Sequence, residues 1–269
     1  MTHYLDRPQG RLAYDLTGDE DGPLVVLSPG MGDLRSTYRG LTGQLASAGF
    51  RVVTADLRGH GDSSVGWTDV SVAAVAADLL ALLHPHGGRG VLAGNSYSGS
   101  AAVQAAAKDP AAVAGLVLLG AFVRDHPASL LQRTFFSVFG RTVPGRALWT
   151  AVAWPSFFGT KPADYPERKA ELAANLRRPG GYEVLRRITR EGSHAPTEPQ
   201  LAKVTAPTLV VMGTKDPDFP DPAAEARFTA DALAGPAEVL MVEGAGHYPQ
   251  TEAVDVVAKA VTDFARTVS

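Results

Sequence analysis

The chain has 269 residues, of which 45% are apolar and 20% charged, and its formal net charge is −3. This composition is too apolar for a disordered chain and lacks the basic excess expected of a general nucleic-acid binder. The absence of cysteine excludes thiol catalysis, disulfide bonds and thiolate metal sites.

Short apolar runs bounded by turn residues recur along the chain and predict β-strands. The first run alternates apolar and polar side chains, as a half-exposed strand does. The later runs are continuously apolar, which is typical of parallel strands buried on both faces. The predicted strands are residues 11–18, 23–28, 50–56, 90–95, 113–120, 207–213 and 237–244.

Segments with the apolar spacing of helices lie between most of these strands. They are residues 38–49, 70–83, 97–110, 222–235 and 252–267. Strands that alternate with helices predict an α/β fold with a doubly wound, mostly parallel sheet. In such a sheet the functional groups gather at the carboxyl ends of the strands.

Residues 122–200 interrupt the alternation, because they contain several helical segments and no convincing strand. We therefore expect residues 122–200 to form a helical insertion in a sheet domain made of residues 1–121 and 201–269. Eight of the twenty aromatic residues lie between positions 122 and 158. Some should fill the interior of this insertion, and others should line a pocket between the insertion and the sheet, where ligand sites are common. The residues predicted to line that pocket are Phe122, Phe135, Phe136, Trp154 and Tyr248.

A candidate nucleophile follows the strand 90–95, within GNSYSG. A serine on a sharp turn between strand and helix needs small neighbours, and here Gly94 and Ser98 flank Ser96 at two residues' distance. Such a turn exposes the hydroxyl and directs the backbone N–H of Tyr97 at the reacting carbonyl oxygen. Alternatives are a serine-rich helix start and the neighbouring Ser98, but the strand–turn–helix context favours Ser96.

A serine nucleophile needs a base, and the base needs an orienting carboxylate. His247 follows a predicted strand in a turn of small residues, and Asp216 follows another. The order Ser96, Asp216, His247 is the one expected over a doubly wound sheet. The rival carboxylates are Asp218 and Asp221 in the same loop and, more weakly, Asp125.

These motifs together resemble the α/β-hydrolase superfamily over nearly the whole chain. GNSYSG resembles its nucleophile elbow, DLRGHGDSS the loop after the preceding strand, PTLVVMGTKDPDFP the acid-bearing segment and VEGAGHYPQTE the histidine loop. The resemblance implies an eight-stranded sheet, a helical cap, or lid, at residues 122–200 and a cofactor-free serine mechanism. It also implies a second oxyanion donor, which here would be the backbone N–H of Met31. Because the elbow carries Ser96, relatives with an aspartate nucleophile, such as epoxide hydrolases and haloalkane dehalogenases, are disfavoured.

The chain departs from the family pattern at two places. Pro29-Gly30 stands where many members have His-Gly, and Asn95 stands where histidine is common. Asn95 could support the turn or face the pocket. Two further histidines lie near these motifs: we interpret His60 as an anchor for its loop, and His194 as a surface residue with a pocket contact as the minor alternative.

The expected activity is hydrolysis of a small to medium carboxylic ester or lactone with an apolar portion. The alternatives are a C–C bond hydrolase or another tailoring enzyme using the same triad and, in another class, a small-molecule receptor with this fold. We expect a small-molecule substrate, no cofactor, no metal site and no nucleic-acid partner, and leave a homodimer open. Because residues 1–10 lack an apolar signal core and no apolar run approaches the roughly 18 residues of a membrane span, we expect a cytoplasmic protein.

Overall fold

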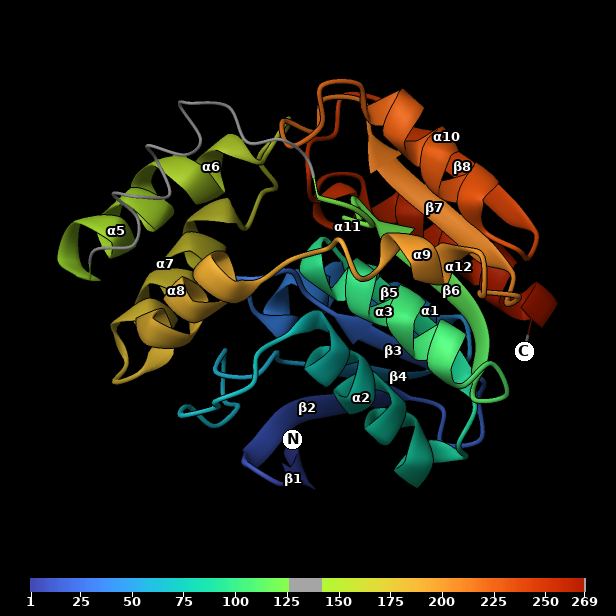
Figure 1. Ribbon diagram of the computed structural model, residues 1–269, viewed down its shortest axis with the longest axis horizontal. Coiled ribbons are helices and arrows are strands. Elements are labelled where there is room, and N and C mark those ends of the chain that lie inside the picture. Colours follow the sequence, from blue (N-terminus) through green and yellow to red (C-terminus); the bar gives the residue numbers. More distant parts are fainter. Residues whose placement is uncertain (126–141, 269) are drawn as a thin grey trace.

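The computed structural model describes residues 1–125 and 142–268. Their strands form one eight-stranded sheet in the order β1-β2-β4-β3-β5-β6-β7-β8 (Figure 1). Within this sheet β2 runs antiparallel to both of its neighbours, β1 and β4, and the other neighbouring strands are parallel. The strands are β1 (Thr2–Arg7), β2 (Gly10–Gly18), β3 (Leu24–Ser28), β4 (Arg51–Ala55), β5 (Gly90–Asn95), β6 (Val113–Leu119), β7 (Thr208–Gly213) and β8 (Ala237–Val242).

The seven strands expected from apolar patterning are all present, and β1 is an additional strand that the pattern did not indicate. Every residue of β3, β5, β6 and β7 is buried, because helices cover both faces of the sheet. Successive side chains alternate between the faces, so that Val25 and Leu27 pack on one side and Val26 on the other. The doubly wound, mostly parallel sheet is therefore confirmed.

Five longer helices cover the sheet. The helices α1 (Arg39–Ser47) and α12 (Val254–Val268) pack on one face. The other face carries α2 (Val72–Leu83), α3 (Tyr97–Lys108) and α10 (Pro222–Ala232). Two of the helices begin with a capping side chain, Ser71 for α2 and Asp221 for α10, which satisfies a backbone N–H in the first turn. The shorter elements are η1 (Arg35–Tyr38), η2 (His84–His86), α9 (Glu198–Leu201) and α11 (Pro249–Glu252).

A second group of helices lies together beside the sheet (Figure 1). These are α5 (Thr142–Leu148), the π-helical turn η3 (Trp149–Ala153), α6 (Trp154–Ser156), α7 (Tyr165–Arg177) and α8 (Gly181–Glu191). They share an apolar cluster with Tyr248 of the sheet domain, to which they contribute Trp149, Trp154, Leu172 and Leu185 among others. Arg168 of α7 also donates hydrogen bonds to the backbone oxygens of Ser36 and Thr37.

The exit from this group is tied to the sheet domain before α9 begins. The side-chain amide of Gln104 in α3 donates a hydrogen bond to the Thr197 hydroxyl at 2.8 Å. We keep the division into a core of residues 1–121 and 201–269 and a cap of residues 122–200 as a proposal.

Among the helices of residues 1–125 and 142–268, none combines the length and the apolar character needed to cross a bilayer.

Candidate active site

The turn between β5 and α3 holds Ser96 in a strained conformation. Its φ of 55° is the only positive value at a non-glycine residue in the described parts of the chain, and such strain persists only where the surroundings enforce it. A Cβ at Gly94 would lie 2.4 Å from the backbone oxygen of Ser98, and one at Gly99 would lie 2.3 Å from the Ala121 side chain. The glycines therefore allow α3 to pack closely behind the turn.

The two serines of the turn have different surroundings. Ser98 is fully buried, and its hydroxyl lies 2.9 Å from the Ser28 hydroxyl and donates to the Pro29 carbonyl at 2.5 Å. Ser96 instead lines a cavity of about 330 Å³. Of these two serines, only Ser96 therefore lines a space that a ligand can enter.

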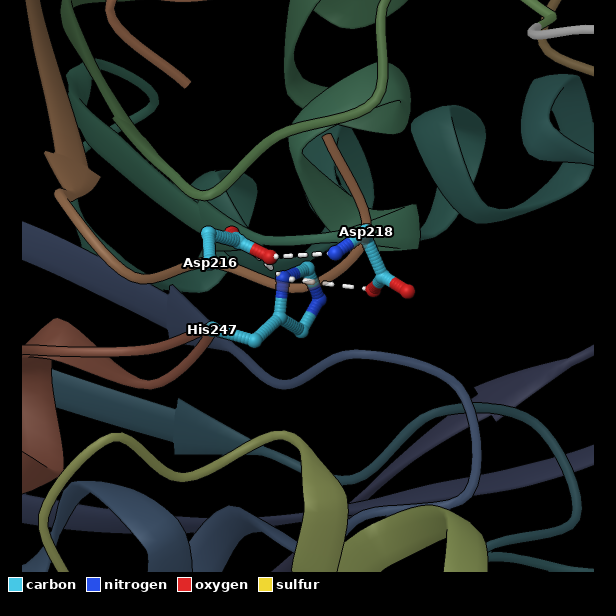
Figure 2. Close-up of side chains that lie close together, drawn as sticks. All are labelled: Asp216, Asp218 and His247. Atoms are coloured by element: carbon cyan, nitrogen blue, oxygen red, sulfur yellow. Dashed lines mark hydrogen bonds and ion pairs between the residues drawn. The ribbon is translucent and has the colours of Figure 1, made fainter. Parts of the chain in front are cut away.

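His247 lines the same cavity and is held by Asp216 (Figure 2). The imidazole Nδ1 lies 2.8 Å from Asp216 Oδ2, and both side chains are almost completely buried. The backbone N–H of His247 donates to the Phe157 carbonyl at 2.7 Å. A Cβ at Gly120 would lie 3.2 Å from both His247 Nδ1 and Asp216 Oδ2, so the glycine leaves room for this pair.

A second carboxylate approaches the same ring. Asp218 Oδ2 lies 3.4 Å from His247 Nδ1, and Figure 2 shows Asp216 and Asp218 reaching the imidazole from two sides. Burial raises the pKa of Asp218 to about 6. Burial alone lowers the pKa of His247, but Asp216 and then Asp218 outweigh it and raise this pKa to about 9.

The other rival carboxylates have different partners. Asp221 accepts a hydrogen bond from Ala224 N as the cap of α10. Asp125 accepts from the Ser193 hydroxyl and from the His194 backbone N–H.

Asp216, Asp218 and His247 could also gather round a cation, because one ligand atom from each lies within 4.8 Å of the others. A metal ion on Nδ1 would displace the ring proton that bonds to Asp216. A metal site and a His247 ring hydrogen-bonded to Asp216 through Nδ1 therefore exclude each other. Loss of activity in a chelator would indicate the metal site.

Asn95 supports the turn and does not face the cavity. Its amide nitrogen donates to the Leu119 carbonyl at 2.8 Å and to the His247 carbonyl at 3.1 Å. The side chain is fully buried. It thus joins the Ser96 turn to the His247 loop.

The cavity is mostly apolar, and its walls come from the sheet domain and from the second group of helices beside it. Its described lining is Gly30, Met31, Ser96, Phe122, Trp149, Val152, Ala153, Ser156, Phe157, Pro217, Asp218, His247 and Tyr248. Phe122 and Tyr248, both predicted for the pocket, belong to this lining. Trp154 does not: it is 1% exposed and stacks on Tyr165 with its ring 5.2 Å away. Phe135 and Phe136 lie outside the described residues.

Trp149 and Phe157 also line the cavity, although neither was predicted to. Both belong to the aromatic-rich segment 122–158, but the helical phase that directs them to the cavity is not readable from the sequence pattern. The π-helical turn changes that phase locally.

The loop after β3 packs directly against Ser96. A Cβ at Gly30 would lie 3.0 Å from the Ser96 Cβ, and Met31 follows in the cavity lining. On the other side, Tyr97 begins α3, so its backbone N–H is among the first of that helix and lacks an intrahelical carbonyl partner.

His60 and Trp149 hold this loop at Gly32, the residue after Met31. The backbone N–H of Gly32 donates to His60 Nε2 at 2.9 Å, and the Trp149 indole N–H donates to the Gly32 carbonyl at 3.2 Å. His60 Nδ1 donates to the Arg58 carbonyl at 2.8 Å. Burial lowers the pKa of His60 to about 4, so the ring is neutral and accepts at Nε2.

His194 is part-buried and stacks on a cavity residue. Its ring lies 5.1 Å from that of Phe122 at 20°, and its Nδ1 lies 2.6 Å from the Ser100 hydroxyl. His194 is therefore only partly exposed, and it contacts the cavity residue Phe122 without itself belonging to the described lining. The loop EGSHAPT contains no apolar spacing that could have revealed this packing.

Comparison with known proteins places the chain in a family. A family model described as the alpha/beta hydrolase family matches residues 25–260. The chain belongs to the α/β-hydrolase family. It is a hydrolase, as the esterases, lactonases and other hydrolases among its relatives indicate.

Three relatives illustrate the range of reactions in this family. The chain is 29% identical to a pimeloyl-[acyl-carrier protein] methyl ester esterase of Xanthomonas axonopodis pv. citri, over 92% of this chain and 96% of that protein. It is 25% identical to the proline iminopeptidase PfmaB of Pestalotiopsis fici, over 97% and 98%. The structure of an enol-lactonase from Burkholderia xenovorans LB400 superposes with a TM-score of 0.81 at 26% identity, covering 97% of this chain and 99% of that one.

Proposed function

We propose that this α/β-hydrolase cleaves small to medium carboxylic esters or lactones with Ser96, His247 and Asp216. The observation that carries the proposal is the shared cavity, which is lined by both His247 and the strained Ser96. The Nδ1 atom of His247 is hydrogen-bonded to the buried Asp216. A serine, a base and an orienting carboxylate are the groups that nucleophilic acyl transfer requires.

In this mechanism the hydrogen bond to Asp216 places the ring proton of His247 on Nδ1 and leaves Nε2 as the base. Nε2 takes the proton of Ser96 while Oγ attacks the carbonyl carbon, and then gives that proton to the departing alcohol. Water, deprotonated by the same nitrogen, attacks the acyl-enzyme and releases the carboxylic acid. The backbone N–H groups of Met31 and Tyr97 stabilise the oxyanion in both halves of the reaction.

The cavity supports an ester with an apolar portion. Its walls are mainly aromatic and aliphatic, and about 330 Å³ lies within the range of small-ligand pockets. The methyl ester and the enol-lactone in the names of two relatives belong to the same chemical class. We include the helical cap at residues 122–200 in the proposal, because Trp149, Val152 and Phe157 from this segment form one wall of the cavity.

The proposal is tested with a fluorophosphonate probe, which reacts with activated serines. We expect one adduct, which peptide mapping places on Ser96, and Ser96→Ala should abolish both labelling and ester turnover. Ser98→Ala is the matched control, since Ser98 lies outside the cavity, and should still be labelled. An adduct on Ser98, or ester turnover that survives in Ser96→Ala, would contradict the assignment. Activity lost in a chelator would instead favour a metal-assisted reaction.

The wall of the cavity should set the preferred acyl chain length. Each methylene buried there contributes up to about 0.8 kcal/mol, or about fourfold in kcat/KM. We therefore expect kcat/KM to rise from acetate to at least butyrate esters and then to fall. Phe157→Ala should move the optimum to longer chains, whereas Phe158→Ala should leave it in place, because Phe158 is outside the lining and packs on Trp154 and Tyr248. Equal optima in the two variants would show that the Phe157 ring does not limit the chain.

A further inference from the structure

The mostly apolar cavity contains one carboxylate besides the proposed triad. Asp218 is the only Asp or Glu among its described lining residues, and that described lining includes no Lys or Arg. The side chain is 24% exposed, and its backbone N–H donates to Asp216 Oδ1 at 3.0 Å. This hydrogen bond holds Asp218 at the cavity wall, directly beside His247.

We infer that Asp218 selects substrates by charge, so that the site takes neutral and cationic esters in preference to anionic ones. The inference rests on the proposed function, because it concerns the substrate of that same site. It adds a substrate class that neither the triad nor the apolar wall determines.

The physical basis is the small separation between Asp218 and any bound substrate. The carbonyl of a bound ester must reach Ser96 beside His247, and His247 Nδ1 is 3.4 Å from the Asp218 carboxylate. A second negative charge in a cavity of about 330 Å³ therefore lies close to Asp218. At such distances, with the effective dielectric of a protein surface, repulsion between two like charges lowers the affinity for the substrate by about 10- to 100-fold. Because Asp218 is partly exposed, we expect the lower part of this range.

A positively charged group on the substrate is attracted both by Asp218 and by the aromatic walls of the cavity. Phe122, Trp149, Phe157 and Tyr248 all line the cavity, and aromatic faces attract cations. A cationic ester should therefore be used at least as well as its neutral analogue. A dicarboxylic half-ester finds no guanidinium or ammonium group in the described lining, and the His247 imidazolium is already paired with Asp216 and Asp218.

The test compares substrates that differ only in charge. On the acyl side these are monomethyl glutarate, its neutral terminal amide and methyl 5-aminopentanoate. On the alcohol side they are choline butyrate and its uncharged analogue 3,3-dimethylbutyl butyrate. We expect kcat/KM for the neutral amide to exceed that for monomethyl glutarate by about 10- to 30-fold at low ionic strength. Asp218→Asn should reduce this ratio to about threefold or less.

Ratios within one variant cancel any effect of the substitution on the catalytic step itself. Asp218→Glu should retain the discrimination, because it keeps the charge. Glu243→Gln, which removes an exposed charge outside the cavity lining, should leave the ratio unchanged. A wild-type ratio near one, or a ratio that Asp218→Asn does not change, would overturn the inference. The wild-type ratio alone decides the matter if Asp218→Asn does not fold.

The proposed function fails separately. If the neutral amide ester is not turned over, or is still turned over by Ser96→Ala, the assignment of the site as a serine esterase is wrong. If its turnover requires Ser96 but the charge ratio is near one, the esterase assignment stands and only the role of Asp218 is wrong.

Discussion

Replacing His247 with alanine is expected to lower kcat/KM for esters by about 10⁴-fold or more. In the proposed mechanism this variant loses both the base that deprotonates Ser96 and the proton donor to the leaving alcohol. Asp216→Asn should cost up to about 10⁴-fold, because an amide cannot stabilise the imidazolium and favours the wrong ring tautomer. Both effects are measured as initial rates with a neutral short-chain ester, after thermal unfolding has shown that the variants are folded.

Asp218→Asn is the comparison that identifies the acid. It should cost less than Asp216→Asn, because Asp216 makes the 2.8 Å bond to Nδ1 and Asp218 lies at 3.4 Å. If Asp218→Asn lost more activity than Asp216→Asn, Asp218 would be the carboxylate that orients His247.

The pH profile of kcat/KM gives an internal check on the same residue. His247 must be neutral to act as a base, and Asp216 and Asp218 raise its pKa to about 9, so activity should climb through the alkaline range. Asp218→Asn removes one cause of this rise in pKa and should move the limb to lower pH. A limb that does not move would show that Asp218 has no electrostatic effect on the base.

Replacing His60 with leucine is expected to lower kcat by about 10²-fold with little change in KM, although His60 lies outside the cavity lining. The substitution leaves the backbone N–H of Gly32 buried without its acceptor and releases the peptide that follows Met31. Loss of a single oxyanion donor costs about 10²–10³-fold in kcat. Displacement of the Met31 N–H, the proposed oxyanion donor, should therefore weaken mainly the binding of the transition state.

His60→Gln is the conservative variant, because its amide oxygen can accept from Gly32 N in place of Nε2. It should recover part of the lost kcat. A trifluoromethyl ketone, which forms a tetrahedral adduct with the serine, should lose affinity for His60→Leu, while a non-electrophilic alcohol analogue should bind unchanged. Equal losses for the two inhibitors, or an increase in KM alone, would indicate general damage to the site instead of a displaced oxyanion donor.

The fold could be predicted from the sequence because its strands are buried on both faces. A continuous run such as LVVLS has few alternatives to a central parallel strand. By contrast, β1 reads THYLDR and mixes polar and apolar residues without a clear period. This strand exists because it pairs with β2 from Thr2↔Asp15 to Arg7↔Gly10, and such pairing is a tertiary effect that local pattern does not encode.

The candidate site likewise contains residues that the sequence pattern predicts and residues that it does not. Ser96, Asp216 and His247 follow strands whose ends meet, so chain order and strand position suffice to propose them. The neighbours of the triad depend on side-chain direction instead. Asp218 differs from Asp216 by two positions in a loop, and only the folded loop shows that both reach His247. Trp154 was expected in the pocket for its residue type alone, but it packs inside the helical group.

The hydrogen bonds of Asp125 to Ser193 and His194 have a consequence for the evolution of this enzyme. They join the two ends of the long intervening segment, which therefore leaves and re-enters the sheet domain at one point. A segment anchored in this way can be shortened, extended or exchanged without altering the path of the strands that carry Ser96, Asp216 and His247. The loop-closure cost of a longer insert grows only slowly with its length, by about 0.6 kcal/mol for each doubling. Replacement of this one contiguous stretch of gene would therefore change the proposed substrate-binding wall and leave the proposed triad of Ser96, Asp216 and His247 in place.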